Sequence, residues 1–219
     1  MRRRPALLLA AAGLACLSAG GSPPELPQGP LTLEILMHHM ATTSGVRAQF
    51  HEVKQIALLE QPLESDGTLY FIPPARMARI TRTPGATSLV INGSRMSYRD
   101  GTGGNSVDLS GNRVARTIVE NFVVLFNGDL DALHEHYNVG FDAQGARWQI
   151  RLAPKGPPLA QLIASIEMRG NGPALEQMVV VEKEGDRTTT FFHDVVTDTR
   201  FSPEELSRIF LEDTPAKTP

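Results

Sequence analysis

The chain has 219 residues, of which 41% are hydrophobic, and it carries 21 Lys and Arg residues, 24 Asp and Glu residues and one cysteine. A net charge of −3 argues against a nucleic-acid partner, which requires a basic face. A single cysteine allows no internal disulfide, so the fold must depend on its own core, and a chain of about 200 residues suits one domain.

The chain begins with the pattern of a secretory leader. Three arginines at 2–4 precede an apolar run over 6–17, and small residues follow at 18–21. The run is about twelve residues long, well below the roughly twenty that span a bilayer. We therefore expect a signal peptide over 1–21, a Pro-rich spacer over 22–30, one domain over 31–210 and a flexible tail over 211–219. Removing the three arginines leaves 18 basic and 24 acidic residues, a net charge of −6.

The position of Cys16 leaves two outcomes open. Ala15-Cys16 fits the site at which a lipoprotein leader is cut and its cysteine acylated, although Gly13 and Leu14 reverse the usual order before it. Either Cys16 is discarded with the leader, giving a free protein, or it is acylated and tethers the domain.

The first half of the domain predicts one helix and a series of short strands. Thr32 is a candidate N-cap for a helix that ends before Gly45, and alternating apolar residues from Val46 predict a half-buried strand. Asn92-Gly93 predicts a hairpin turn. Further strands are expected over 68–72, 76–82, 88–91 and 95–99.

The second half begins with helices and returns to strands. Apolar residues at helical spacing predict a helix over 114–126 that is closed by Asn127-Gly128, and Asp129 can cap a second short helix. Later segments predict strands at 147–152, 163–168, 177–182 and 188–195, and a terminal helix at 203–210.

These elements predict a mainly β fold with added helices. Because no alternation of strand and helix is visible, a parallel sheet is disfavoured and the sheet is expected to be antiparallel. One face of the sheet is apolar and the other charged, so the amphipathic helices must cover the apolar face. An apolar ligand then has a place between sheet and helices.

The chain lacks the motifs of the common enzyme classes. It has no Gly-x-Ser-x-Gly, no His-Glu-x-x-His, no phosphate loop and no dinucleotide glycine pattern. The glycine-rich stretch 101–104 is expected to be a plain loop. His38 and His39 are adjacent, and His134 and His136 are two apart, so neither pair has the spacing of helical metal ligands. We expect no enzymatic activity, no metal and no cofactor.

Apolar residues of mixed shape on the strands and helices are the candidate residues for an apolar-ligand site. Methionine and aromatic side chains suit a surface that accepts flexible chains, because methionine repacks easily. Composition alone does not separate such a surface from a filled core. The candidates are Phe50, Leu69, Phe71, Met77, Met96, Tyr98, Phe122, Phe126, Trp148, Ile150 and Met168.

The order of motifs resembles the outer-membrane lipoprotein carrier (LolA-like) family. The similarity is strongest in Gly-Thr-Leu-Tyr-Phe-Ile-Pro-Pro at 67–74. It extends over nearly the whole domain, through residues 48–54, 58–65, 125–130, 137–139, 148–155 and 175–192.

The resemblance implies an incomplete antiparallel β-barrel whose concave apolar face is covered by helices. Members of this family bind the acyl chains of lipoproteins and carry them through the periplasm, from an inner-membrane donor to an outer-membrane acceptor. The resemblance thus implies a monomeric periplasmic carrier and chaperone that serves protein transport and outer-membrane biogenesis without a cofactor.

One position departs from the family pattern. The family places an arginine just after the Gly-x-Leu strand, where it bonds the lid, and the matching residue here is Pro73. Arg76 and Arg79 follow, and Arg76 is a candidate replacement. The departure allows a relative that carries another lipid.

Two other functions stay open. The same fold can serve as a lipid-binding sensor of envelope stress that regulates a membrane protein. An enzyme acting on lipids would need a Ser–His pair that opens into the cavity.

Overall fold

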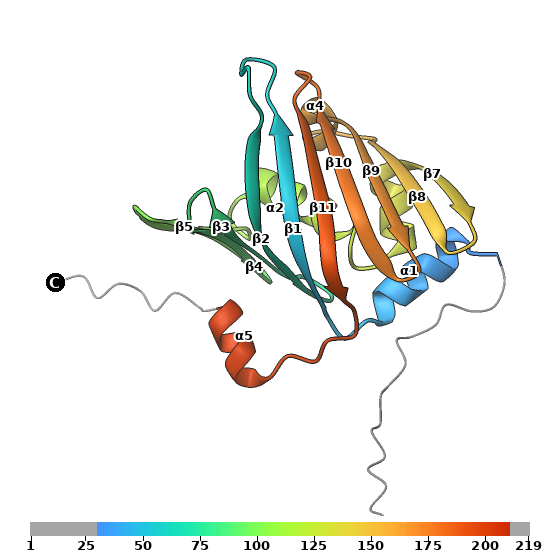
Figure 1. The fold of residues 1–219 in the computed structure, drawn as a ribbon, viewed down its shortest axis with the longest axis horizontal. Coiled ribbons are helices and arrows are strands. Elements are labelled where there is room, and N and C mark those ends of the chain that lie inside the picture. Colours follow the sequence, from blue (N-terminus) through green and yellow to red (C-terminus); the bar gives the residue numbers. More distant parts are fainter. Residues whose placement is uncertain (1–29, 211–219) are drawn as a thin grey trace, which may run out of the picture.

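The computed structural model describes residues 30–210, so the expected signal peptide with Cys16, most of the expected spacer and the expected tail lie outside the described residues. The described chain forms one antiparallel sheet with the strand order β6-β5-β4-β3-β2-β1-β11-β10-β9-β8-β7. The strands at the two ends of this order do not pair with each other, so the barrel stays open (Figure 1). This is the incomplete antiparallel barrel expected from the sequence.

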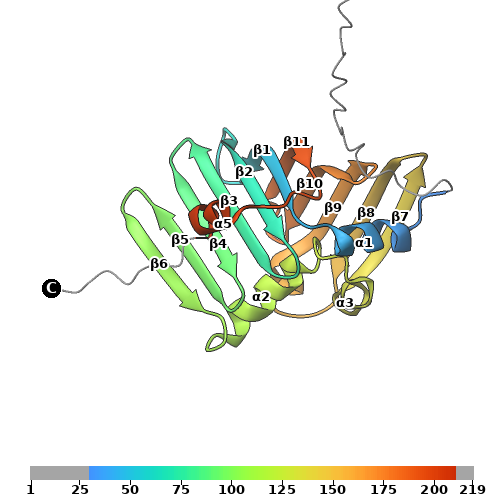
Figure 2. The same cartoon turned by 90° about the horizontal axis from the view of Figure 1, so that it is seen from below.

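The strands are β1 (Val46–Gln55), β2 (Leu63–Ile72), β3 (Arg76–Thr83), β4 (Thr87–Asn92), β5 (Arg95–Asp100), β6 (Gly103–Asp108), β7 (Tyr137–Gln144), β8 (Arg147–Pro154), β9 (Ile163–Asn171), β10 (Ala174–Glu182) and β11 (Arg187–Val196). The helices are α1 (Leu33–Thr42), α2 (Arg113–Val123), α3 (Leu130–His136), α4 (Leu159–Leu162) and α5 (Pro203–Ile209). Figure 2 shows α1, α2 and α3 gathered along one side of the bent sheet.

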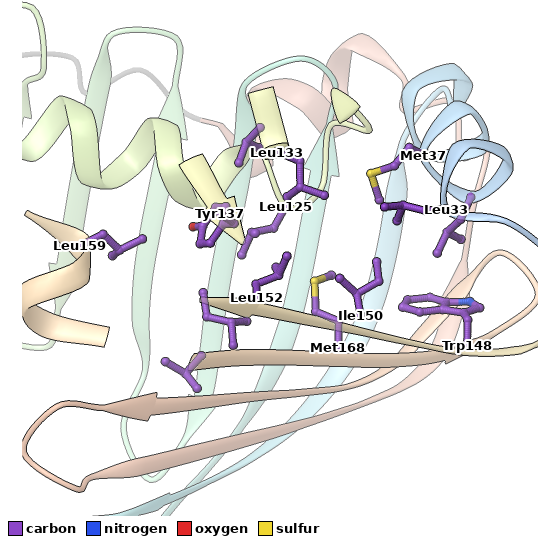
Figure 3. Packing of buried hydrophobic residues seen from close by; sticks show 14 residues of the cluster. Leu33, Met37, Leu125, Leu133, Tyr137, Trp148, Ile150, Leu152, Leu159 and Met168 are labelled. Carbon is purple, nitrogen blue, oxygen red and sulfur yellow. The ribbon is translucent and has the colours of Figure 1, made fainter. Parts of the chain in front are cut away.

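The larger core lies between α1, α3 and the strands β7–β10. Leu36 and Met37 of α1 and Leu133 of α3 point towards the sheet (Figure 3 labels the last two) and pack among buried side chains of the facing strands. The helix caps predicted from the sequence are confirmed. The side chain of Thr32 accepts a hydrogen bond from the amide of Ile35, and that of Asp129 from the amide of Ala132. This half of the barrel is filled.

Four of the five helices and most strands lie where the sequence predicted them, but the short helix α4 and two strands were missed. The expected loop over 101–104 is wrong in part, because Gly103 and Gly104 begin the edge strand β6. The strand β7 was not predicted and follows α3 without any intervening residue. The hairpin between β4 and β5 is present, and its two loop residues are Gly93 and Ser94 because Asn92 still pairs with Arg95.

The outer face of the sheet is not uniformly charged, contrary to the expectation. Over β2, β3 and β4 it carries an apolar patch that includes Ala78 and Ile80. Ile209 and Phe210 at the end of α5 are buried against this patch, and Figure 2 shows α5 lying across these strands. The terminal helix therefore covers the face of the sheet opposite to α2.

Among residues 30–210, no helix combines the length and apolar character that crossing a membrane requires.

Candidate functional site

A cavity of about 420 Å³ lies between α2 and the inner face of the sheet. This volume falls within the range of roughly 300–1,000 Å³ that is typical of small-molecule sites. We call it the central cavity. Its lining residues are Phe50, Glu52, Leu69, Met77, Arg79, Leu89, Ile91, Met96, Ile118, Val119, Phe122, Phe126, Ile163, Met178, Val180, Glu182, Thr188, Thr190 and Phe192.

Strand alternation places the sheet residues of the central cavity on one face. Successive side chains of a strand point to opposite faces, so Thr188, Thr190 and Phe192 of β11 face inward together. Cross-strand pairs continue the surface, because Phe50 lies opposite Phe192 and Thr190 lies opposite Met178. The inner surface is thus continuous across the three adjacent strands β1, β11 and β10.

The helix α2 forms the other wall of the central cavity. Asn112 caps it by accepting a hydrogen bond from the amide of Ala115 (3.0 Å). Ile118, Val119 and Phe122 line the cavity at helical spacing. Buried residues of α2 occur only in its last turn, at Asn121 and Val123. The helix is therefore embedded in the core at its C-terminal end and lies over the cavity along the rest of its length.

A buried hydrogen bond fixes the C-terminal end of α2. The Tyr137 hydroxyl donates to the backbone carbonyl of Asn121 over 2.8 Å. Burial raises the pKa of this hydroxyl above its ordinary value of 10.0, so it stays protonated and remains a donor.

The floor of the central cavity also contains charged groups. Arg79 on β3 makes an ion pair with Glu52 on β1, with 2.8 Å between Nη2 and Oε1. The same guanidinium donates to Thr81 and Ser65, and its carbon lies 4.3 Å from the centre of the Phe50 ring. Thr190 donates to the second oxygen of Glu52. Every partner of this pair belongs to the sheet, so the charges are held on the floor.

A second ion pair lies where β1 and β10 end. Lys54 Nζ is 3.1 Å from Glu182 Oε1, and Glu182 lines the cavity. The cavity therefore has an apolar part against α2 and a polar part that runs along Glu52 and Arg79 towards Glu182.

The structure brings seven of the candidate residues together. Phe50, Leu69, Met77, Met96, Phe122 and Phe126 line the central cavity. Phe71 lines a smaller apolar pocket of about 60 Å³ beside α1, which shares Leu69, Phe126 and Phe192 with the central cavity. The ring centres of Phe71 and Phe126 are 5.9 Å apart.

The other four candidates lie elsewhere. Tyr98 on β5 is exposed, opposite Leu89 at the margin of the cavity. Trp148, Ile150 and Met168 are buried in the filled core beneath α1 and α3 (Figure 3). The indole nitrogen of Trp148 donates to the carbonyl of Gly172, which satisfies its one polar atom.

Sequence reasoning missed several lining residues. Met178, Val180 and Phe192 alternate along β10 and β11 in the same pattern as the recognised strands, so strand periodicity could have identified them. Glu52 and Arg79 had no such signal, because their pairing joins β1 to β3 across β2.

Strand register decides whether Arg76 or Arg79 faces the cavity. Arg76 is exposed and pairs with Ile72, which packs with the α5 cluster on the outer face. Arg79, three residues further on, faces the cavity. Arg76 therefore does not reach the cavity side, and Arg79 is bonded to the sheet.

Within the described part of the chain, no three His, Asp or Glu side chains lie close enough together to hold a metal ion.

An open antiparallel sheet that bends around an apolar cavity, with a helix along it, defines a class of β proteins with an internal binding surface. The chain belongs to the outer membrane lipoprotein carrier protein LolA-like family, whose model matches residues 27–208. No curated protein matches the chain in sequence.

Solved structures resemble the fold at low sequence identity. A LolA superfamily protein from Nitrosomonas europaea is 9% identical, covers 84% of this chain and 99% of its own, and has a TM-score of 0.45. A putative outer membrane lipoprotein-sorting protein domain from Vibrio parahaemolyticus is 10% identical, covers 80% of this chain and 96% of its own, and has a TM-score of 0.44. The MucA/MucB complex of Pseudomonas aeruginosa contains a chain that is 11% identical. The match covers 78% of this chain and 57% of that one, with a TM-score of 0.44.

Proposed function

We propose that this protein is an exported carrier that holds the acyl chains of a lipoprotein or a related lipid in the central cavity and moves them through the periplasm towards the outer membrane. The observation that carries the proposal is the central cavity itself: about 420 Å³, walled by apolar side chains from the sheet and from α2. Membership of the LolA-like family supports the same function.

The candidate residues that line the cavities form the proposed acyl-chain contacts. They are Phe50, Leu69, Phe71, Met77, Met96, Phe122 and Phe126. Trp148, Ile150 and Met168 contribute by filling the other half of the barrel, which confines the acyl chain to the side under α2.

The hydrophobic effect supplies the binding free energy. Each buried methylene contributes about 0.8 kcal/mol, so roughly ten of them contribute about 8 kcal/mol before the cost of association is subtracted. No covalent step and no cofactor is required. Release follows when an acceptor binds the chain more tightly, or when α2 moves away from the sheet.

The test is native mass spectrometry of the protein after expression in a periplasm, together with uptake of a fluorescent fatty acid by protein from which lipid has been removed. We expect co-purifying lipid and saturable uptake with one acyl-binding site. Absence of both would contradict the carrier function.

The sensor function is separated from the carrier function by transfer. A carrier delivers bound lipid from one vesicle population to another, whereas a sensor binds lipid without delivering it and retains a membrane-bound regulator in a pulldown. Transfer without a retained regulator supports the carrier.

A further inference from the structure

Three connections meet at one end of the barrel. They are the β1–β2 loop (56–62), the segment that leads into and includes α4 (155–162), and the β10–β11 turn (183–186), and Figure 1 shows all three at the top. The amide of Ala57 donates to Asp186 Oδ1 over 3.0 Å, and the amide of Lys183 donates to the carbonyl of Leu162 over 2.8 Å. These bonds join the three connections into one surface.

This surface concentrates exposed leucines. Leu58 is 94% exposed, and Leu59, Leu63 and Leu162 are between 48% and 53% exposed. Among residues 30–210, eight large hydrophobic side chains are exposed, and the four leucines of that set are these four. We call them the leucine rim. An apolar side chain as exposed as Leu58 adds almost nothing to the stability of the fold, and clustered exposed apolar groups mark interaction sites.

The leucine rim lies beside one end of the central cavity. Leu63 pairs with Lys54, whose ammonium group bonds the cavity-lining Glu182. Leu162 directly precedes Ile163, which lines the cavity as well. A surface that contacts the rim therefore lies against this end of the cavity.

The shape and charge of the rim indicate what it contacts. Figure 1 shows the loop between β1 and β2 extending beyond the strands, and this loop contains Leu58, which is 94% exposed. A fluid lipid layer accepts a projecting side chain without a matching pocket. The three connections contain two basic residues, Lys155 and Lys183, and three acidic ones, Glu60, Glu184 and Asp186. With no cationic excess, the rim has no electrostatic preference for anionic lipid.

We propose that the leucine rim inserts into the surface of a lipid bilayer, with Leu58 and Leu59 entering the layer and the adjacent end of the central cavity held against it. Attachment is transient, because two leucines supply only a small part of the apolar area that stable anchoring needs. The inference depends on the proposed function only for the idea that cargo passes through this end of the cavity, since the rim is exposed whatever the cavity holds.

The test is flotation of the mature protein with vesicles of phosphatidylcholine and phosphatidylethanolamine, with and without phosphatidylglycerol. We expect measurable vesicle binding that changes little with anionic lipid or salt. Leu58→Ser combined with Leu59→Ser should weaken binding by roughly tenfold or more, because two leucines no longer transfer from water to an apolar layer. The matched control is Val114→Ser combined with Val196→Ser, which removes two exposed apolar side chains away from the rim and should retain binding.

Uptake of the fluorescent fatty acid from solution, without vesicles, separates this inference from the proposed function. Normal uptake by the rim variant, together with lost vesicle binding, supports the rim as a membrane contact. Equal vesicle binding by the rim variant and the wild type overturns it, and so does a rim-dependent dimer that does not bind vesicles. Rim-dependent vesicle binding by a protein that takes up no fatty acid overturns the carrier function and supports the rim.

Discussion

Gly67 shows how a single residue shapes the cavity floor. A Cβ at this position would lie 2.2 Å from the backbone oxygen of Ile80 and 2.5 Å from the Phe50 ring. The ring of Phe50 therefore occupies the space that any side chain at 67 would need, and Arg79 lies over that ring. The glycine in the Gly-x-Leu motif is explained by this close approach.

Gly67→Ala is therefore expected to move Phe50 and Arg79. Overpacking of this kind typically costs about 1–3 kcal/mol. We expect a lower free energy of unfolding in urea and weaker fatty-acid uptake. Gly85→Ala is the matched control, because no atom lies within 4 Å of a Cβ at that position. Unchanged stability and uptake in the Gly67 variant would show that both the Phe50 ring and the backbone of β3 at Ile80 can shift at no cost.

Phe122 tests the wall formed by α2. Phe122→Glu places a carboxylate in the apolar part of the central cavity, and burial of an unpaired charge beneath an acyl chain is strongly unfavourable. We expect uptake of the fluorescent fatty acid to fall by at least roughly tenfold while the circular dichroism spectrum is unchanged.

The matched control for Phe122 is Phe191→Glu. Phe191 is exposed on β11 and alternates with the cavity-facing Thr190 and Phe192, so its side chain is on the outer face. Normal uptake is expected from this variant. Persistent uptake by the Phe122 variant would mean that the ligand does not lie against α2.

Asp66 contributes a pH-dependent interaction on the outer face of the sheet. Its carboxylate accepts hydrogen bonds from His51 Nδ1 (3.0 Å) and from the Thr83 hydroxyl (3.0 Å). These bonds, the one from His51 first, hold the pKa of Asp66 below its ordinary value of 3.8.

Because this pKa is lowered by folding, the stabilisation from Asp66 is fully present above pH 3.8 and declines as the pH falls towards the folded-state pKa. We expect Asp66→Asn to be less stable than the wild type at neutral pH, and the difference to shrink in acid. Urea unfolding at a series of pH values measures it. A difference that stays constant down to the most acidic point would contradict this interpretation.

At the scale of elements, α2 is held at one end and free of the core at the other. Tyr137 fixes the last turn through the Asn121 carbonyl, whereas Val114 in the first turn is exposed. The helix can therefore tilt about its C-terminal end without unfolding the barrel.

Tyr137→Phe removes this attachment and leaves a buried carbonyl without its donor, which costs about 1–3 kcal/mol. We expect faster amide hydrogen exchange in α2 and faster release of bound fatty acid. Tyr98→Phe, which alters an exposed tyrosine, should change neither rate. Slow exchange in the Tyr137 variant would show that core packing alone holds the helix.

Sequence patterns predicted the elements that carry strong local signals. Helix caps at Thr32 and Asp129 and the alternation along β1 and β8 were sufficient for those elements. The missed strands lack such signals. The edge strand β6 begins with two glycines and is mostly exposed, and β7 starts immediately after His136 with no turn residue to separate it from α3.

At the scale of the whole molecule, the sequence could identify the inner face but could not show which half of it was filled. Phe50 on β1 and Trp148 on β8 are both buried aromatic residues in strands whose side chains alternate between buried and more exposed. Their surroundings differ because α1 and α3 pack closely over Trp148, whereas α2 leaves a cavity over Phe50. Periodicity shows which side of a helix is apolar, but it carries no information about how closely that helix packs against the sheet.

The ion pair between Glu52 and Arg79 affects the protein when no ligand is bound. A purely apolar cavity of this size would stay dry, but polar groups in a roomy cavity bind water. Water can therefore enter along Glu182, Glu52 and Arg79 as an acyl chain leaves, and withdraw as the next one arrives. The barrel need not collapse between cargoes, so the exchange of hydrocarbon for water can be repeated many times by the same folded molecule.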